Sequence, residues 1–267
     1  MNGKKIGGIV CIVLGVLIGL VFINDSSKND TREELISNVI FIEDTSQISE
    51  ANEGKAIIVT GHPELPQDAV DTKNNIHAKA PYLKRIDESY RWVSCKHQYR
   101  NSNDDYCMEW TSAGTEEFEV DAKIGSYSIP CKTLFSLSMP QKNLPLAQED
   151  AARLNMKIDT DDHRDYFTKT PGLRSSSTRH DGGAQRTTYI YKDLSGYDTI
   201  TVLGIQEKGS IVTNDMFSAH SYDHAMTRDE VIAQYKEDQK EGFMIGMIVM
   251  AIFILIGGIL IHVSRKQ

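Results

Sequence analysis

The sequence predicts an α+β protein in which a mostly antiparallel-sheet extracytoplasmic domain lies between two transmembrane helices. Three observations lead to this prediction: a long apolar run near each end of the 267 residues, a strongly hydrophilic middle, and short β-branched segments within that middle. The mean hydropathy is −0.35 although 40% of the residues are hydrophobic, because the apolar residues are concentrated at the ends. This length and composition exclude a chain that is disordered throughout and a disulfide-dense miniprotein.

Two apolar runs are long enough to cross a bilayer. Residues 6–23 are 18 consecutive uncharged residues, and residues 242–264 are 23. At about 1.5 Å per residue the shorter run covers about 27 Å of helix, close to the thickness of a bilayer core. A cleaved signal peptide competes for the first run, since Lys4 and Lys5 precede it, but no small-residue cleavage site follows. A lipoprotein anchor at Cys11 is disfavoured because few apolar residues precede it, so an uncleaved anchor is predicted.

The flanking charges predict the orientation of both spans. Lys4 and Lys5 precede the first span, and Arg265 and Lys266 follow the second, so the positive-inside rule places both termini in the cytoplasm. The predicted organisation is a cytoplasmic tail (1–5), a transmembrane helix (6–23), an extracytoplasmic or lumenal α+β domain (24–241), a transmembrane helix (242–264) and a cytoplasmic tail (265–267). The expected location is the cell (inner) membrane of a bacterium, or the endoplasmic reticulum or inner nuclear membrane of a eukaryote.

The predicted outward domain is acidic. All 37 Asp and Glu residues lie between Asp25 and Glu241, together with 25 of the 29 Lys and Arg residues, which gives this part a net charge of −12. Nucleic-acid binding needs a basic footprint, so this composition argues against it. The expected partners are the lipid bilayer and other membrane proteins or a second copy of the chain.

Within the domain, β-branched runs bounded by turn residues predict strands. Residues 55–61 (KAIIVTG) form one such run. Residues 187–191 and 199–203 form two more, and the seven residues between them include Gly196. The sequence therefore predicts that these two runs pair as a hairpin.

Helices are predicted at three places in the domain. The composition of residues 144–156 is helical, and a polar, loop-like stretch follows at 159–180. A threonine followed three residues later by glutamate, the spacing of a capping box, opens two more helices at Thr31 and Thr227. The helix that begins at Thr227 has no glycine or proline before Gly242 and leads into the second span.

One segment of the domain is symmetric about Asn101. Trp92 and Cys95 lie nine and six residues before it, and Trp110 and Cys107 lie at the same distances after it. A hairpin centred there would place the tryptophans opposite each other and the cysteines likewise, with Cβ atoms about 4.5–5.5 Å apart, close to disulfide reach. In an oxidising compartment a Cys95–Cys107 disulfide would contribute on the order of 3 kcal/mol. The alternative is two unpaired cysteines on a hairpin.

No motif in the sequence carries a catalytic signature. The acidic run 159–165 lacks the glycine at the sixth position and the acid at the twelfth position of a calcium loop. His220 and His224 are four residues apart, but the residues between them are not typical of a helix, so a metal site there is disfavoured. Zinc-protease, Cys-x-x-Cys, nucleophile-elbow and phosphate-loop patterns are all missing from the sequence. We therefore predict no catalytic residues, no metal site and no cofactor.

Four segments of the domain together resemble the transmembrane protein 43 (Luma) family in order and spacing. They are GKAIIVTG (54–61), LKRIDESYRWV (83–93), YCMEW (106–110) and VLGIQEKG (202–209). The family's Arg-x-x-Glu-x-Tyr-x-Trp core falls on Arg85, Glu88, Tyr90 and Trp92, its third segment includes Trp110, and its Gly-x-Gln-x-x-Gly motif falls on Gly204, Gln206 and Gly209. The resemblance implies a membrane protein that organises or scaffolds membrane or envelope proteins and is not an enzyme. Family members carry several spans after the domain, whereas one is predicted here.

The first of these motifs admits two interpretations. Tyr90 and Trp92 are two residues apart on a strand and share a face, and Arg85 and Glu88 are close enough to form an ion pair. Either these residues are core aromatics and an ion pair that fix the fold, or they form a recognition surface on the hairpin.

The leading functional hypothesis is a non-enzymatic membrane scaffold that binds other membrane or envelope proteins through its outward domain. One alternative is an extracytoplasmic ligand sensor or receptor, which would act through a partner because the predicted cytoplasmic tails are short. A membrane-anchored hydrolase is the other alternative.

Overall fold

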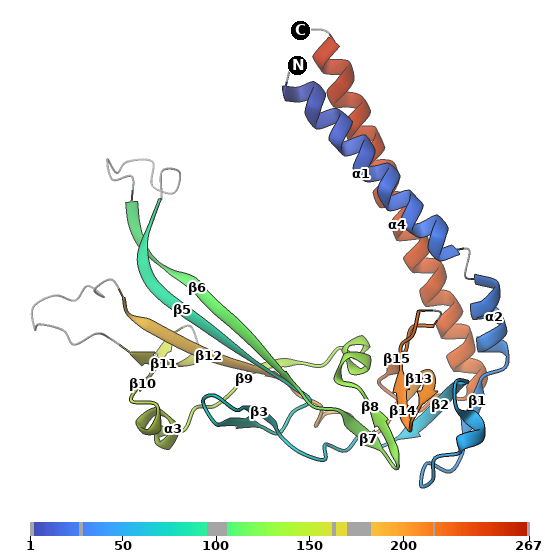
Figure 1. The fold of residues 1–267 in the computed structure, drawn as a ribbon, viewed down its shortest axis with the longest axis horizontal. Helices are drawn as coiled ribbons and strands as arrows, with labels where there is room; N and C mark the ends of the chain where they lie inside the picture. Colours follow the sequence, from blue (N-terminus) through green and yellow to red (C-terminus); the bar gives the residue numbers. More distant parts are fainter. Residues whose placement is uncertain are drawn as a thin grey trace, which may run out of the picture. The chain divides into compact units, whose positions relative to one another are not determined.

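The chain folds as an α+β protein with mostly antiparallel sheets, as the sequence predicts (Figure 1). The computed structural model describes residues 3–26, 29–94, 106–161, 164–169, 183–215 and 217–265. The chain divides into two compact units, of which the first combines Met1–Thr60 with Thr201–Gln267 and the second is Gly61–Ile200. The second unit is thus inserted in sequence between the two halves of the first.

The first unit contains both long helices and a small sheet. Its elements are α1 (Gly3–Ser26), α2 (Asn29–Ser37), β1 (Ile40–Ile42), the 3-10 helix η1 (Glu50–Asn52), β2 (Ala56–Gly61), β13 (Ile200–Glu207), β14 (Ser210–Val212), β15 (His220–Tyr222) and α4 (Arg228–Arg265). Strand β1 is parallel to β2, β2 lies next to β13, and β14 and β15 are both antiparallel to β13. The predicted strand at 55–61 is confirmed as β2.

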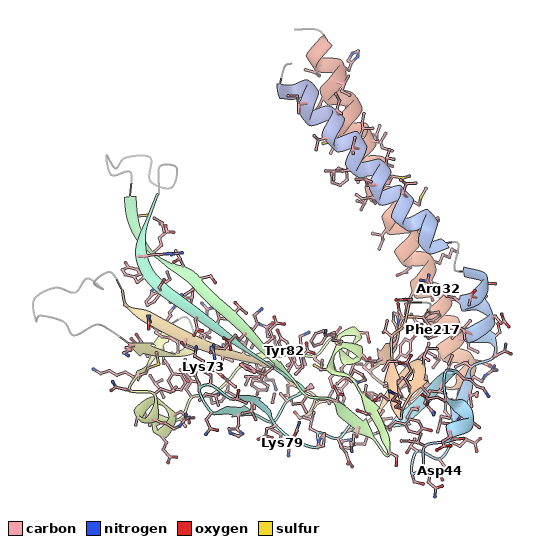
Figure 2. All side chains as sticks on the ribbon, viewed as in Figure 1. Arg32, Asp44, Lys73, Lys79, Tyr82 and Phe217 are labelled. Carbon is pink, nitrogen blue, oxygen red and sulfur yellow. The ribbon has the colours of Figure 1, made fainter. Side chains whose placement is uncertain are left out.

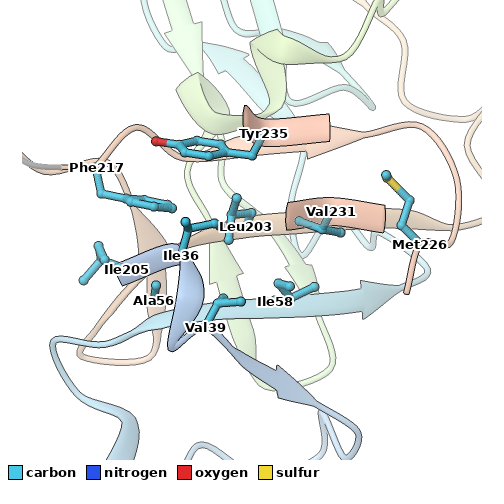
Figure 3. Packing of buried hydrophobic residues seen from close by; sticks show 10 residues of the cluster. All are labelled: Ile36, Val39, Ala56, Ile58, Leu203, Ile205, Phe217, Met226, Val231 and Tyr235. Carbon is cyan, nitrogen blue, oxygen red and sulfur yellow. The ribbon is translucent and has the colours of Figure 1, made fainter. Parts of the chain in front are cut away.

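The core of the first unit lies between this sheet and two helices (Figure 3). Its buried members are Ile36, Val39, Ala56, Ile58, Leu203, Ile205, Phe217, Met226, Val231 and Tyr235. Alternate residues of β2 and β13 supply one side of this core, since successive side chains of a strand point to opposite faces. The end of α2 and the first two turns of α4 supply the other side, so residues from both ends of the chain complete one core.

The start of α4 is a capping box, as predicted. The backbone N–H of Thr227 donates to Glu230 Oε2 at 2.8 Å, and the N–H of Glu230 donates to Thr227 Oγ1 at 3.4 Å. The helix then runs without a break from Arg228 to Arg265, so the domain helix and the second apolar run are one element. The prediction at Thr31 is displaced, because α2 begins two residues earlier at Asn29.

The second unit is built on one antiparallel sheet in the order β10-β11-β12-β5-β6, with β9 also pairing with β12. Its elements are β3 (Ala69–Asp71), β4 (Ile76–Ala78), β5 (Tyr82–Ser94), β6 (Tyr106–Glu119), β7 (Ala122–Ile124), β8 (Tyr127–Ile129), η2 (Cys131–Ser136), β9 (Gln141–Asn143), α3 (Gln148–Arg153), β10 (Lys157–Asp161), β11 (Arg164–Lys169) and β12 (Gln185–Lys192). The β3–β4 hairpin and α3 cover one face, around Leu83, Phe167 and Tyr189.

The predicted hairpin between residues 187–191 and 199–203 is wrong. Both segments are strands, but β12 pairs with β5, β9 and β11, whereas β13 pairs with β2, β14 and β15 in another sheet. The β-branched composition therefore predicts the strands and not their partners, because strand pairing here joins residues about 100 positions apart, such as Thr187 with Asp87.

The stretch 144–169 also differs from its prediction. The helix is confined to α3, and Leu144 and Leu146 pack against the core from the segment before it. The predicted polar loop is in part a β10–β11 hairpin, in which Thr160 Oγ1 donates to Asp165 Oδ1 at 2.9 Å. Residues 162, 163 and 170–182 lie outside the described residues.

The register of the β5–β6 hairpin differs from the symmetric one predicted. Trp110 is paired with Tyr90, and Cys107 with Val93, so the two tryptophans are not opposite each other. A bulge between the pairs Asp87–Gly114 and Glu88–Ser112 inserts one extra residue in β6. From Glu88 to Ser94, each residue of β5 pairs with the residue two positions before the one that symmetry about Asn101 requires. Cys95 lies outside the described residues, so the Cys95–Cys107 disulfide stays a prediction.

Candidate functional site

Arg85, the first residue of the predicted motif, is buried at the centre of an ionic network in the second unit. It is 1% exposed and lies on β5. Its guanidinium contacts three carboxylates: Nη1 is 2.6 Å from Asp71, Nε is 2.9 Å from Asp87, and Nη2 is 2.7 Å from Glu116. Because these carboxylates come from β3, β5 and β6, one side chain joins three strands.

Asp71 is the buried partner in this network, and all its interactions are internal. Tyr189 donates its hydroxyl to Asp71 Oδ2 at 2.7 Å, and the backbone N–H groups of Lys73 and Asn74 donate to Oδ1. Burial by itself would raise the pKa of Asp71, but the hydrogen bonds from Tyr189, Arg85 and the Asn74 backbone outweigh it and lower the pKa below the ordinary 3.8. A buried charge that is this well paired is a structural feature of the fold.

The predicted ion pair between Arg85 and Glu88 is not formed. The two residues are three apart on one strand, which places them on opposite faces of the sheet. Glu88 instead accepts hydrogen bonds from Arg186 of β12, at 2.6 Å from Nε and 3.2 Å from Nη2. The motif residues therefore divide between the buried face and the opposite face of the sheet.

On that opposite face, Arg186 joins Glu88 to two aromatic residues, and a third packs against one of them. Its guanidinium carbon is 4.5 Å from the ring centroid of Trp110 and 5.6 Å from that of Tyr166. Tyr90 and Trp110 are paired across the β5–β6 ladder, with ring centroids 5.3 Å apart. We call Glu88, Tyr90, Trp110, Tyr166 and Arg186 the aromatic–cation surface.

The aromatic–cation surface has the composition of a protein-binding hot spot. All five side chains are half-buried, so each is held in place by its neighbours while part of it stays accessible. Trp, Tyr and Arg are the residue types that contribute most to protein–protein affinity, and a cation over an aromatic face contributes about 0.5–2 kcal/mol. The fourth motif residue, Trp92, is paired with Met108 in the same ladder, and its side chain lies outside the described residues.

The second predicted motif forms the β13–β14 turn. Lys208 and Gly209 both have positive φ, +50° and +81°, the conformation of a two-residue turn that favours glycine. A Cβ on Gly204 would lie 2.6 Å from Ile211 Cγ2, so only glycine fits between β13 and β14. The fully buried Gln206 donates from Nε2 to the carbonyl of Ser49 at 2.8 Å. The motif therefore fastens the loop before β2 to β13 and has a structural role.

The helices α1 and α4 pack against each other in opposite directions (Figure 1). A Cβ on Gly8 would lie 2.8 Å from the backbone oxygen of Gly257, and one on Gly19 would lie 2.5 Å from Met250 Sδ. Glycine at these positions allows the two backbones to approach closely, as in pairs of transmembrane helices.

The exposed side chains along the apolar parts of this helix pair are mostly hydrophobic (Figure 2). Of the 21 exposed large hydrophobic residues described, 19 lie on α1 or α4, with exposures up to 65% at Leu255. Among the described residues, only α4 is long and apolar enough to cross a membrane by length and composition, over Arg228–Val263, and 11% of its most apolar part is buried. The described apolar part of α1, Ile6–Leu20, is shorter. A core helix of a soluble domain would be mostly buried.

His220 and His224, where a metal site is disfavoured by the sequence, have separate surroundings in the structure. His220 lies in β15, with its ring centroid 5.6 Å from that of Tyr235 and the rings nearly perpendicular, and His224 contacts Asp223 at 2.8 Å. In the part of the chain that the structure describes, no group of three or more His, Cys, Asp and Glu residues is arranged to hold a metal ion.

No protein-family model, curated protein or solved structure matches this chain. The resemblance to the transmembrane protein 43 family therefore stays a prediction.

Replacing Arg85 tests whether the ionic network holds the second unit together. Arg85→Met leaves Asp71 buried without its cation, and we expect a loss of about 3–5 kcal/mol in the free energy of unfolding. Lys84→Met is the matched control, because Lys84 pairs with the half-exposed Glu117 on the other face of the strand and should cost about 1 kcal/mol or less. Urea unfolding followed by tryptophan fluorescence measures both, since both tryptophans lie in β5 and β6. Equal losses of unfolding free energy in the two variants would show that the ionic network adds no more stability than an exposed ion pair.

The lowered pKa of Asp71 predicts acid sensitivity. A carboxylate whose pKa is lower in the folded state stabilises that state above its ordinary pKa of 3.8 and ceases to do so as pH falls through the lowered value. The urea midpoint of the Asp71→Asn variant should therefore lie below that of the unmodified protein at pH 7, and the difference should shrink below about pH 4. A difference that stays constant from neutral pH to pH 2.5 would contradict this.

Proposed function

We propose that this chain is an integral membrane protein in which α1 and α4 cross the bilayer as an antiparallel pair. The observation that carries the proposal is the concentration of exposed apolar side chains on these two helices. Water around such a surface would cost about 25 cal/mol per Å² of apolar area, and soluble monomers rarely expose contiguous apolar patches beyond a few hundred Å². A lipid environment removes this cost.

The charges at the chain ends support the proposed orientation. Because α1 and α4 run in opposite directions, Lys4 and Lys5 lie at the same end of the pair as Arg265. An excess of basic residues marks the cytoplasmic side of a span. The acidic domain between the helices then lies on the extracytoplasmic or lumenal side.

We infer that the outward domain acts as a scaffold that binds other membrane or envelope proteins, and that it does so through the aromatic–cation surface. In this surface the charges of Glu88 and Arg186 already neutralise each other, which lowers the cost of covering them with a partner. The aromatic rings supply apolar contact area at a low cost in side-chain entropy. The resemblance to the transmembrane protein 43 family is in keeping with such a role.

A ligand sensor that acts through a partner is the second candidate function. The unbroken path of α4 from the core of the first unit into its apolar segment favours it, because a rigid helix can transmit a change in the domain to the membrane. Neither function requires a catalytic residue.

The membrane proposal predicts labelling from opposite sides. In a variant without native cysteines, Glu43→Cys reports on the exposed surface of the domain and Lys5→Cys on the basic end of α1. In sealed vesicles an impermeant maleimide should label only one of the two until detergent is added. The chain should also remain in the membrane fraction after alkaline carbonate extraction. Labelling of both positions from one side, or release of the chain by carbonate, would refute the proposal.

The scaffold proposal predicts that Trp110→Ala removes specific neighbours. After crosslinking in intact membranes, we expect a defined set of co-purified proteins with the unmodified chain and a loss of about tenfold or more in their yield with Trp110→Ala, as for a hot-spot residue. Phe135→Ala is the control, because Phe135 is another accessible aromatic residue of the same unit, 38% exposed. Identical neighbours and yields for both variants would rule out this surface as the partner site.

A further inference from the structure

The first two turns of α4 belong to the core of the first unit. Val231 and Tyr235 are 0% and 2% exposed and pack with residues of β2 and β13. The Tyr235 ring also stacks on Phe217, with centroids 4.9 Å apart and planes 13° from parallel (Figure 3). The same helix then continues to Arg265 without a break, so no flexible linker separates the core from the apolar segment.

The segment that follows α1 in the chain also contributes to the core of the first unit. Helix α2 follows α1 in the chain, and Ile36 at its end and Val39 just after it are core members. Arg228, the first residue of α4, donates from Nε to the carbonyl of Val39 at 2.9 Å and from Nη2 to the carbonyl of Ser37 at 2.7 Å. These hydrogen bonds satisfy carbonyls at the end of α2, and they fix the start of α4 to the end of α2.

At the other end, the spacing of α1 and α4 is fixed by backbone contact. A Cβ on Gly257 would lie 2.7 Å from the backbone oxygen of Gly8 and 2.6 Å from Ile12 Cγ1. A larger side chain at this position must push the helices apart, because the backbone oxygen of Gly8 cannot move aside by a change of rotamer. The neighbouring Gly258 has no atom within 4 Å of its would-be Cβ.

We propose that the spacing of α1 and α4 within the bilayer controls the packing of the core of the first unit. The inference rests on the proposed membrane function. A displacement of α4 relative to α1 is carried along the continuous helix to Val231 and Tyr235, while Arg228 holds the end of α2 to the same helix. Packed cores resist gradual deformation and change between discrete arrangements. A transmembrane neighbour that separates the two helices therefore alters the outward domain.

The test compares Gly257→Leu with Gly258→Leu in the full chain in lipid nanodiscs. The two variants have the same composition, but only the first forces the helices apart. With Gly257→Leu, amide hydrogen exchange in β2, β13 and the start of α4 should accelerate about fivefold or more, the usual lower range of coupling between two sites. With Gly258→Leu it should match the unmodified chain. Equal exchange for both variants would overturn the proposal.

A second pair of variants separates transmission from general misfolding. Four glycines inserted after Lys240 interrupt α4 between the core and the apolar segment, since glycine is a poor helix former. In this background Gly257→Leu should no longer change exchange in β2 and β13. If Gly257→Leu accelerates exchange in β2 and β13 equally in this background, the substitution acts by misfolding. That result would also overturn the proposed coupling between the helix pair and the core.

Carbonate extraction of each variant distinguishes this inference from the function it rests on. Release of the unmodified chain would refute membrane insertion itself. Retention of every variant together with unchanged exchange would refute only the coupling.

Discussion

The first unit depends on one constraint: its core is complete only when both ends of the chain are present. Ile36 and Val39 come from the amino-terminal part, whereas Val231 and Tyr235 come from the carboxy-terminal helix. The apolar area that these residues remove from water stabilises a sheet of short strands, of which β1, β14 and β15 have three residues each. Such strands are too short to be stable by themselves. Helix α4, which carries part of the apolar surface, is thus also one of the elements that stabilise the sheet.

The sheet of the second unit is stabilised in another way, because ion pairs of a buried arginine connect its strands. Arg85 contacts carboxylates from three strands, and Asp71 receives hydrogen bonds from Tyr189 and from its own loop. An ionic centre of this kind contributes little net free energy relative to an apolar one, but removing one of its charged partners is costly. It therefore fixes the relation of β5 to the β3–β4 hairpin, and leaves the opposite face of the sheet to the aromatic–cation surface.

The features that could be predicted from sequence are local ones. The β-branched run of β2 and the capping box at Thr227 depend on neighbouring residues, and the structure confirms both. The ion pair of Glu88 with Arg186 joins residues 98 positions apart and has no local signal. The register of β5 and β6 between Glu88 and Ser94 differs by two residues from the symmetric one, so the symmetry of the segment about Asn101 does not determine it. That Arg85 and Glu88 lie on opposite faces could have been predicted from the sequence. Side chains alternate between the two faces of a strand, so residues three apart point in opposite directions.

The scaffold and the sensor differ in what the domain must do after a partner binds. A scaffold needs only a fixed surface and an anchor, and a flexible linker between them would serve as well as a rigid helix. In this chain α4 enters the core without a linker, and Arg228 ties its first turn to the end of α2. A rigid connection costs conformational freedom that a simple anchor has no need to give up. Its presence favours the second candidate function, a sensor in which the helix pair and the first unit change together.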